Sequence, residues 1–171
     1  KPDIVLLSKS ISGYGLPLSL VLIKPELDVW CSGEHNGTFR ANNLALVAAS
    51  TALEYWRNND LQHEVLEKEK VINHFLQQLL DDELITSYRG MGLIWGVEFK
   101  NGDQAKQIAA LSFAQGVMIE TCGNNGQVLK LLPPLTISNT MLKLGLKKIA
   151  DAINTNQEKH HKYSDPTLLT I

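Results

Sequence analysis

Lys9 is the residue whose type and position most suggest chemistry, because it directly follows a short apolar run. That run, Ile4 to Leu7, has the pattern of a parallel strand buried on both faces and leads into the loop SKSISGYG. Catalytic groups of α/β folds gather at the carboxyl ends of such strands. A lysine there is partly desolvated, which makes its neutral, nucleophilic amine accessible. An ordinary solvated lysine is the alternative, and position alone leaves both open.

Other residue types that bind metals or attack substrates give weaker patterns. Cys31 and Cys122 are too few and too far apart for a disulfide framework or a zinc site, so two reduced thiols are expected. His160 and His161 are adjacent but lie between lysines in a polar tail, with no third ligand nearby in the sequence. No metal site is predicted.

Composition and charge restrict the class of partner. The chain has 171 residues, 44% of them hydrophobic and 20% charged, with a formal net charge of -2. Nucleic-acid surfaces need a clustered basic excess, and no apolar run reaches the roughly 18 residues that span a bilayer. We therefore expect a cytoplasmic protein that binds small molecules rather than nucleic acid or membrane.

The elements that must position Lys9 come first in the chain. A second apolar run covers 18–23, and polar, glycine-containing residues 31–43 predict a loop. Residues 44–56 are apolar nearly all round and predict a buried helix. A second helix follows Asp60 with one apolar face, and it ends near Asp81.

The remaining residues predict a small α+β unit. A strand is expected at 93–99, then a helix capped by Asp103 and reaching Gln115. Strands at 117–120 and 128–131 surround a Gly-Asn-Asn-Gly turn. Ser138 caps a last helix, whose core face is formed by Leu142, Leu146, Ile149 and Ile153. The predicted class is α/β, with a piece of a larger sheet layer at 1–60, a small domain at 61–156 and a polar tail at 157–171.

Four segments in order along the chain share features of one enzyme family. They are PDIVLLSKSISGYGLP (2–17), HNGTF (35–39) with Asn42 soon after, RGMGLIWGVE (89–98) and LPPLTI (132–137). Together they resemble the signatures of class III (ω-type) pyridoxal-phosphate-dependent aminotransferases. SKSISGYGLP together with EHNGTFR is most similar to the diaminobutyrate–2-oxoglutarate aminotransferases.

The resemblance implies a fold and a cofactor. The fold would be type I of the pyridoxal-phosphate-dependent transferases, represented here by the end of the large-domain sheet and a C-terminal small domain. Lys9 would form the internal Schiff base with pyridoxal 5'-phosphate and later shuttle a proton. Thr38 would donate its hydroxyl to the cofactor phosphate of the neighbouring subunit in a homodimer, although a loop threonine capping a turn is the alternative.

Several further positions can be interpreted by comparison with the family. Arg89 is either a cation near the active-site mouth or an arginine that fixes the glycine-rich turn, and the second is favoured. Lys130 stands where many members have an arginine that binds a carboxylate bidentately, which lysine cannot do. Ala41 stands where many members have glycine, and Asn43 where many have proline. Glu98 is expected to be a satisfied polar group.

The implied reaction transfers the 4-amino group of L-2,4-diaminobutyrate to 2-oxoglutarate, giving aspartate 4-semialdehyde and glutamate in a ping-pong sequence. Another ω-amino-acid transaminase or an aminomutase is an alternative. Full-length members are more than twice as long, and their other cofactor contacts precede Lys9. The chain alone is therefore expected to be inactive, and a third possibility is a fragment that acts only as a dimerisation domain.

Overall fold

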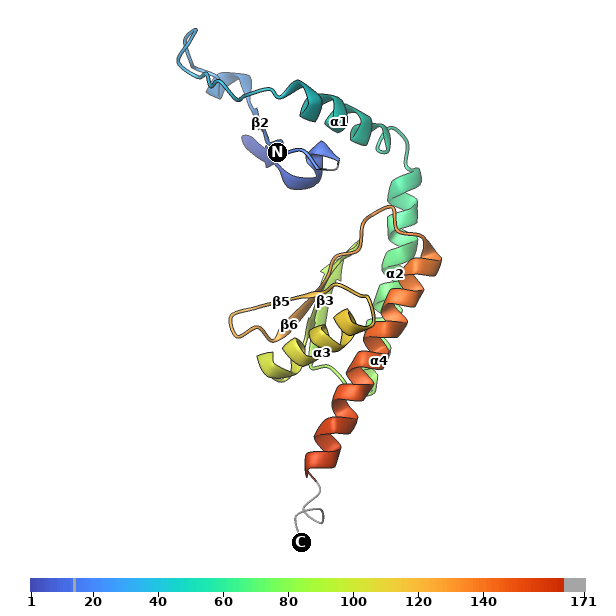
Figure 1. Cartoon of the computed structure of the whole chain (residues 1–171). Coiled ribbons are helices and arrows are strands. Elements are labelled where there is room, and N and C mark those ends of the chain that lie inside the picture. The colour runs from blue at the N-terminus through green and yellow to red at the C-terminus, as the bar shows by residue number, and fades with distance from the viewer. Residues whose placement is uncertain (14, 165–171) are drawn as a thin grey trace. The chain divides into compact units, whose positions relative to one another are not determined.

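The computed structural model describes residues 1–13 and 15–164, with side chains as far as Gln157. The chain divides into two compact units, the first spanning Lys1–Leu61 and the second beginning at Gln62. Figure 1 shows the elements of both units along the chain. The predicted histidine pair and most of the predicted tail lie outside the residues whose side chains are described.

A two-stranded antiparallel sheet begins the first unit. Strand β1 (Ile4–Leu7) pairs with β2 (Leu20–Ile23), with Leu7 opposite Leu20. The predicted strand at 4–7 is confirmed, but its predicted parallel pairing and its burial on both faces are wrong for this chain. β1 has a strand on one side only among the described residues, so Leu6 remains 73% exposed.

Two short 3-10 helices and one α-helix complete this unit. They are η1 (Lys9–Ser12), η2 (Pro25–Leu27) and α1 (Asn43–Glu54). The predicted helix is confirmed, whereas its burial nearly all round is wrong: Ala45 and Ala49 are buried and Leu44 is 71% exposed. Among the described residues of this unit, the alanine-rich side of α1 packs against η1.

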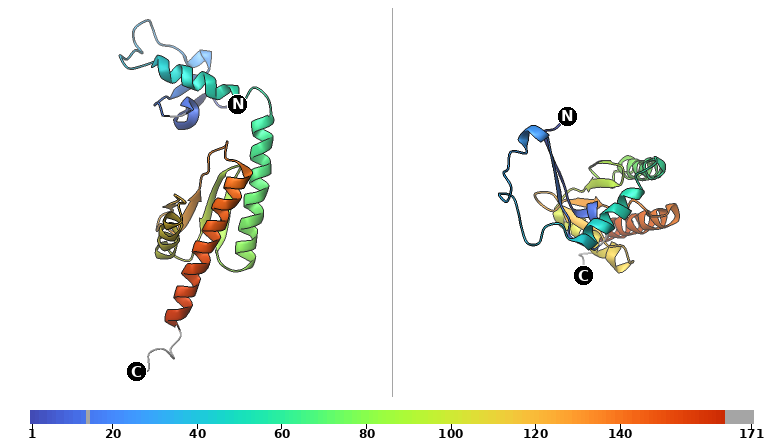
Figure 2. Two further views of the ribbon diagram at one scale, coloured as in Figure 1. Left: turned by 45° about the vertical axis from the view of Figure 1, so that its right-hand side comes forward. Right: turned by 90° about the horizontal axis from the view of Figure 1, so that it is seen from above.

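A four-stranded antiparallel sheet forms the second unit, in the order β3-β4-β6-β5. Three helices share its core, and α3 and α4 pack against each other (Figure 2). The elements are α2 (Asp60–Asp81), β3 (Ser87–Met91), β4 (Ile94–Glu98), α3 (Gly102–Ala114), β5 (Glu120–Cys122), β6 (Val128–Leu131) and α4 (Asn139–Ser164).

One hydrophobic core joins these helices to one face of the sheet. Ile72 and Leu76 of α2, Leu129 of β6 and Ile153 of α4 are each at most 1% exposed. The predicted core faces of α2 and α4 are confirmed, because the period of 3.6 residues places their apolar positions on one side of each helix. Ser138 caps α4 as predicted, its Oγ accepting from the Met141 N–H at 3.2 Å.

Several predicted boundaries differ from the structure. Asn101 caps α3, not Asp103: its side chain accepts from the Gln104 N–H at 2.9 Å. Strand β5 begins at Glu120, later than the predicted run at 117–120. Strand β3 was not predicted. The backbone of α4 is helical to Ser164, so part of the expected polar tail belongs to this helix.

Among the described helices, none combines the length and the apolar composition that crossing a membrane would require.

Candidate functional site

Lys9 begins η1 directly after β1 and lines an open hollow of about 860 Å³ in the first unit. The hollow is lined by residues from the end of the loop before β2, from β2 itself and from the loop before α1, namely Lys9, Pro17, Leu18, Ser19, Leu20, Val21, His35, Phe39, Arg40, Ala41 and Asn42. Lys9 itself is exposed, so the predicted partial desolvation of its amine is not observed in this chain. The predicted position at the end of a strand is confirmed.

The backbone at Lys9 has a conformation that residues other than glycine rarely adopt. Its φ is 57°, in the left-handed region, and Ala41 in the same hollow has a φ of 56°. A non-glycine residue in this region is strained by about 1–2 kcal/mol. Such strain persists where the surrounding structure imposes it, often at functional sites.

Packing behind Lys9 holds η1 in place. The Ser12 hydroxyl donates to the Lys9 carbonyl oxygen at 3.4 Å, and Ser12 is 3% exposed. Gly13 follows with a φ of 77°, and a Cβ built there would lie 3.2 Å from the Ala52 Cβ of α1. The glycine therefore allows the close approach of this turn to the helix.

Thr38 lies in the loop before α1 and is exposed. It is adjacent to Phe39, which lines the hollow, but its own side chain is not among the lining residues. In the same loop Trp30 stacks on His35 with ring centroids 4.6 Å apart. The structure thus places Lys9 and Thr38 in one unit without bringing both to the same hollow.

The residues around this hollow fit one side of pyridoxal phosphate. Lys9 supplies the primary amine that can bond to the cofactor aldehyde, and Arg40 adds a cation within the same lining. None of the described residues that line the hollow carries a carboxylate, the group that would pair with a protonated pyridine nitrogen. This set can hold the aldehyde end of the cofactor but does not enclose the whole group.

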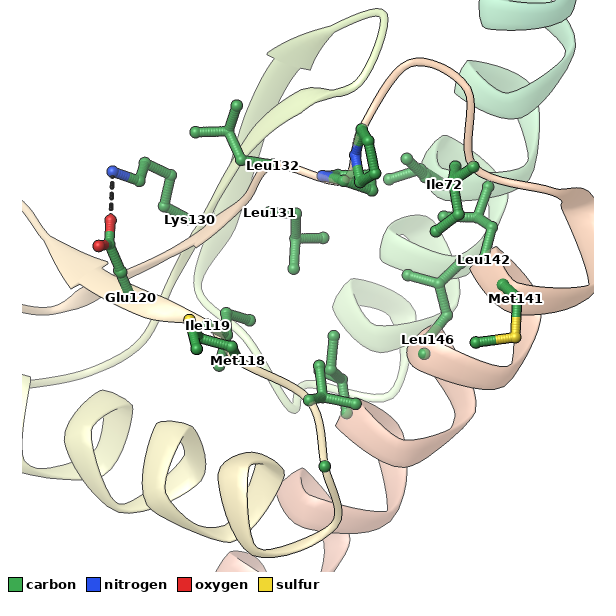
Figure 3. Close-up of a pocket in the computed structure, with 17 residues that line it drawn as sticks. Ile72, Met118, Ile119, Glu120, Lys130, Leu131, Leu132, Met141, Leu142 and Leu146 are labelled. Carbon is green, nitrogen blue, oxygen red and sulfur yellow. Dashed lines mark ion pairs between the residues drawn. The ribbon is translucent and has the colours of Figure 1, made fainter. Parts of the chain in front are cut away.

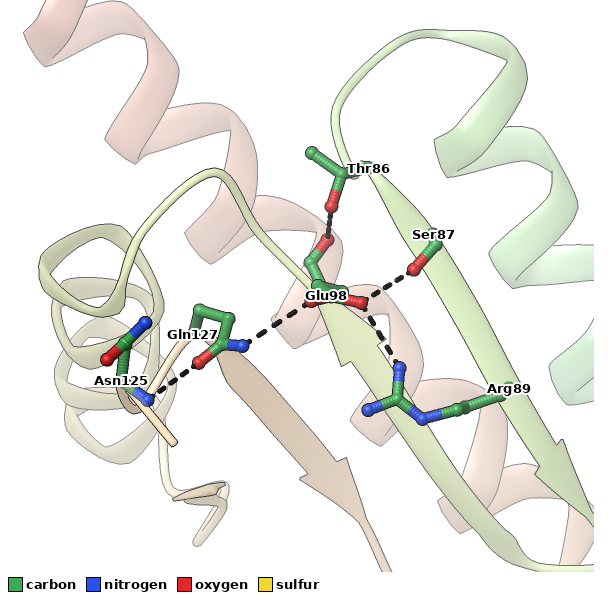
Figure 4. Close-up of polar contacts among 6 residues, drawn as sticks. All are labelled: Thr86, Ser87, Arg89, Glu98, Asn125 and Gln127. Carbon is green, nitrogen blue, oxygen red and sulfur yellow. Dashed lines mark hydrogen bonds and ion pairs between the residues drawn. The ribbon is translucent and has the colours of Figure 1, made fainter. Parts of the chain in front are cut away.

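Arg89 lies on β3 in the second unit and pairs with Glu98 on the neighbouring strand. Its guanidinium Nη1 is 3.1 Å from Glu98 Oε2, which also accepts from the Ser87 hydroxyl at 2.9 Å (Figure 4). The hydrogen bond from Ser87, then those from Gln127 and Arg89, hold the pKa of Glu98 below its usual value. Arg89 thus links two strands, and Glu98 is a satisfied polar group as expected.

Lys130 lies on β6 and faces Glu120 on β5, with Nζ 2.7 Å from Oε2. The hydrogen bond between them raises the pKa of Lys130 and lowers that of Glu120, with their charges adding to both effects. Both residues line an otherwise apolar pocket of about 480 Å³, whose lining also includes Leu132, Met141 and Leu146 (Figure 3). The Lys130 ammonium group is therefore already paired with a carboxylate when no ligand is bound.

The register of the sheet brings these cations to one face. Arg89 pairs with Gly96, Gly96 with Lys130, and Lys130 with Glu120, so the four residues form one row across all four strands. Sequence reasoning missed this row and the partner Glu120. The alternation of side chains along β4, which puts Gly96 and Glu98 on one face, is the signal that could have indicated it.

Comparison with known proteins gives one family. The model of the class III aminotransferases matches residues 1–153. Proteins named diaminobutyrate–2-oxoglutarate transaminase are similar to this chain: the one from Streptomyces avermitilis is 49% identical over 89% of the chain, and the one from Vibrio cholerae 50% identical over 85%. The chain spans 37% and 36% of their lengths.

Solved structures of aminotransferases are also similar to this chain. Acetylornithine aminotransferase from Elizabethkingia anophelis superposes with a TM-score of 0.80 at 28% identity, covering 91% of this chain and 41% of that protein. Ornithine aminotransferase from Toxoplasma gondii gives a TM-score of 0.82 at 26% identity, covering 92% and 38%. The α/β arrangement and the type I transferase fold expected from the sequence are confirmed.

Proposed function

Because this chain belongs to the class III aminotransferases, a pyridoxal-phosphate-dependent family, we propose that the protein containing it is a diaminobutyrate–2-oxoglutarate transaminase. It transfers the 4-amino group of L-2,4-diaminobutyrate to 2-oxoglutarate and releases aspartate 4-semialdehyde and glutamate. The observation that supports this substrate pair is the set of relatives with that name at 46–50% identity.

Lys9 has two roles in this proposal. Its amine binds the cofactor aldehyde between turnovers, and after the substrate amine has displaced it, Lys9 Nζ is the base that takes a proton from the amine-bearing carbon. Pyridoxal phosphate, when bound, supplies an electron-withdrawing ring that accepts the electron pair left on that carbon. The position of Lys9 on the wall of an open hollow agrees with both roles.

The remaining expected site residues enter as parts of the same proposal. Thr38 donates its hydroxyl to the cofactor phosphate of a neighbouring subunit, which agrees with its exposure and its absence from the Lys9 hollow. Lys130 attracts a substrate carboxylate as a point charge in competition with Glu120, and Arg89 adds positive charge to the same row. Residues 1–60 and 61–156 serve as parts of the large and small domains.

Reduction with borohydride tests the cofactor lysine. Protein supplied with pyridoxal phosphate is reduced, digested and analysed by mass spectrometry, and the phosphopyridoxyl group is expected on the peptide that contains Lys9. Lys24, a lysine of the same unit held by Asp3, is the internal control and should stay unmodified. An adduct on other lysines but not on Lys9 would sink the assignment.

A panel of amino donors tests the reaction. L-2,4-diaminobutyrate should give glutamate from 2-oxoglutarate faster than ornithine, 4-aminobutyrate or β-alanine does. A stronger response to one of these donors would favour another ω-amino-acid transaminase, and isomerised substrate without glutamate would favour an aminomutase. Dimerisation without any cofactor adduct would favour the interaction-domain alternative.

A further inference from the structure

Gly145 lies inside α4, although neither its backbone nor its neighbours require a glycine. Its φ is not among the positive ones, so an ordinary residue could adopt the same conformation. A Cβ built there would meet nothing within 4 Å among the described residues. Glycine inside a helix is destabilising by roughly 0.5–1 kcal/mol relative to alanine. The glycine therefore leaves a space beside α4 that the described part of the chain does not use.

This space belongs to the apolar pocket of about 480 Å³ in the second unit. Gly145 lines the pocket, and so do Met141 and Ile149, which lie four residues before and after it. Residues four apart share one face of a helix, so the three positions form a continuous strip of α4 along the pocket wall. The middle position of that strip has no side chain.

The pocket has a buried floor and an exposed apolar rim. Leu131 and Leu142 in the floor belong to the hydrophobic core, whereas Met118 and Met141 are 83% and 57% exposed (Figure 3). Full burial of a methionine side chain contributes about 1.5–3 kcal/mol, and its flexible thioether adapts to irregular apolar partners. An apolar occupant of the pocket would therefore be stabilised both by the floor and by the rim.

The lining suits an apolar side chain of a protein segment better than a free metabolite. Glu120 and Lys130 are the only residues with polar side chains in the described lining, and they are paired with each other at 2.7 Å. Small-molecule sites have a few convergent polar groups that fix the orientation of the ligand. An apolar side chain needs no such groups, because its own backbone holds it in place.

The longer protein proposed above offers such a segment. The chain spans 37% of the Streptomyces avermitilis relative and 41% of the Elizabethkingia anophelis structure, so most of a protein of that size lies outside these 171 residues. A segment of the same polypeptide is present at a high effective concentration beside the pocket, which a separate partner is not. The same polypeptide is therefore the favoured source of the occupant.

We propose that an apolar side chain from the part of the polypeptide outside these 171 residues fills this pocket and packs on Gly145. Met118 and Met141 contact it from the rim, and the missing side chain at position 145 provides the space for it. This inference goes beyond the proposed function, because it requires a longer protein but no particular reaction.

Cross-linking from the rim identifies the occupant in the protein that contains the chain. Its methionines are replaced by photo-methionine, a diazirine analogue of similar shape, and the links formed on illumination are mapped by peptide mass spectrometry. Positions 118 and 141 should link to apolar residues outside the 171. Mixing isotopically heavy and light protein distinguishes links within one copy from links between two. Links only to a second copy, only to residues among the 171, or only to water would overturn the proposal.

Substitution of the glycine supplies a second readout. In Gly145→Leu the new side chain takes up the space, so the links from positions 118 and 141 to residues outside the 171 should be lost. Lys143→Leu is the control: it adds the same side chain at an exposed position of α4 outside the pocket lining and should keep them. Links that persist in a folded Gly145→Leu protein would contradict packing on Gly145, and the wild-type map decides the question if that variant does not fold. The phosphopyridoxyl adduct on Lys9 is measured separately, so its loss with the links retained would count against the proposed function alone.

Discussion

Lys130 and Glu120 face each other on the adjacent strands β6 and β5, and their ion pair has an N–O distance of 2.7 Å. Glu120 is 71% and Lys130 36% exposed at the side chain, so water screens the pair. The pair should therefore contribute only modestly to the stability of the fold. A substrate carboxylate would have to compete with Glu120 for this cation.

The pH dependence of stability should reveal this pair. The folded-state pKa of Glu120 is lowered, so its contribution is present at neutral pH and is lost as pH falls through that pKa, below about 4.5. The pKa of Lys130 is raised above 10.5, so its contribution is lost only as pH rises through that higher value. Urea unfolding from pH 3 to 11 measures both effects.

Glu120→Gln is the variant for this measurement. The difference in unfolding free energy between it and the wild type should be largest from pH 6 to 9 and shrink toward pH 3. A difference that stays constant down to pH 3 would show that the carboxylate charge does not contribute.

Lys68 and Lys70 are two lysines of α2 that differ in burial. Both make ion pairs, but Lys68 is 4% exposed and also donates to the Leu135 carbonyl oxygen at 3.0 Å, while the side chain of Lys70 is 71% exposed. Lys68→Met removes a buried ammonium group together with its hydrogen bond to the Leu135 carbonyl oxygen, and should lower the unfolding free energy by about 1–3 kcal/mol. Lys70→Met should change it little. Equal losses in chemical denaturation would contradict this assignment.

Substitution by alanine should change the stability in opposite directions at two glycines of the second unit. A Cβ at Gly145 in α4 meets nothing within 4 Å, so Gly145→Ala should stabilise by about 0.5–1 kcal/mol. A Cβ at Gly90 in β3 would lie 2.3 Å from the Ile94 carbonyl oxygen, so Gly90→Ala should destabilise by about 1–3 kcal/mol. Thermal unfolding of both variants gives the signs, and a stabilised Gly90→Ala would show that the hairpin relaxes freely.

Asn42 is the N-cap residue of α1 and stabilises the start of this helix. Asn42→Ala removes the acceptor for two helix N–H groups and should lower stability by about 1 kcal/mol, whereas Asn42→Asp keeps the acceptor and should retain most of it. Asn43→Pro places proline at the first helical position, where an N–H has no intrahelical partner, and should be tolerated. Circular dichroism during thermal unfolding separates the three variants.

Sequence patterns predicted the helices of the second unit well because their apolar faces are long and regular. Ile72, Leu76, Leu142 and Leu146 all reach the core as expected. Strand β3 was missed because its five residues, SYRGM, include arginine and glycine and lack an apolar alternation. In the first unit the apolar run of β1 predicted a strand but not its single antiparallel partner.

The candidate site could be predicted only in part. The position of Lys9 after a strand follows from the apolar run that precedes it. The left-handed backbone at Lys9 and Ala41 could not be read from their residue types, because non-glycine residues seldom adopt it. The pairing of Lys130 with Glu120 depends on strand register, and so on where β5 begins, which the sequence placed several residues too early.

The acceptor Glu98 has a consequence for how the second unit folds. Its carboxylate binds Ser87, 11 residues away, and Gln127, 29 residues away with α3 in between. Closing the shorter loop costs less chain entropy, so the β3–β4 hairpin should form before β6 joins it. We therefore expect Glu98 to bind Ser87 within the hairpin first and to accept from Gln127 only when β6 joins the sheet, as a later step of folding.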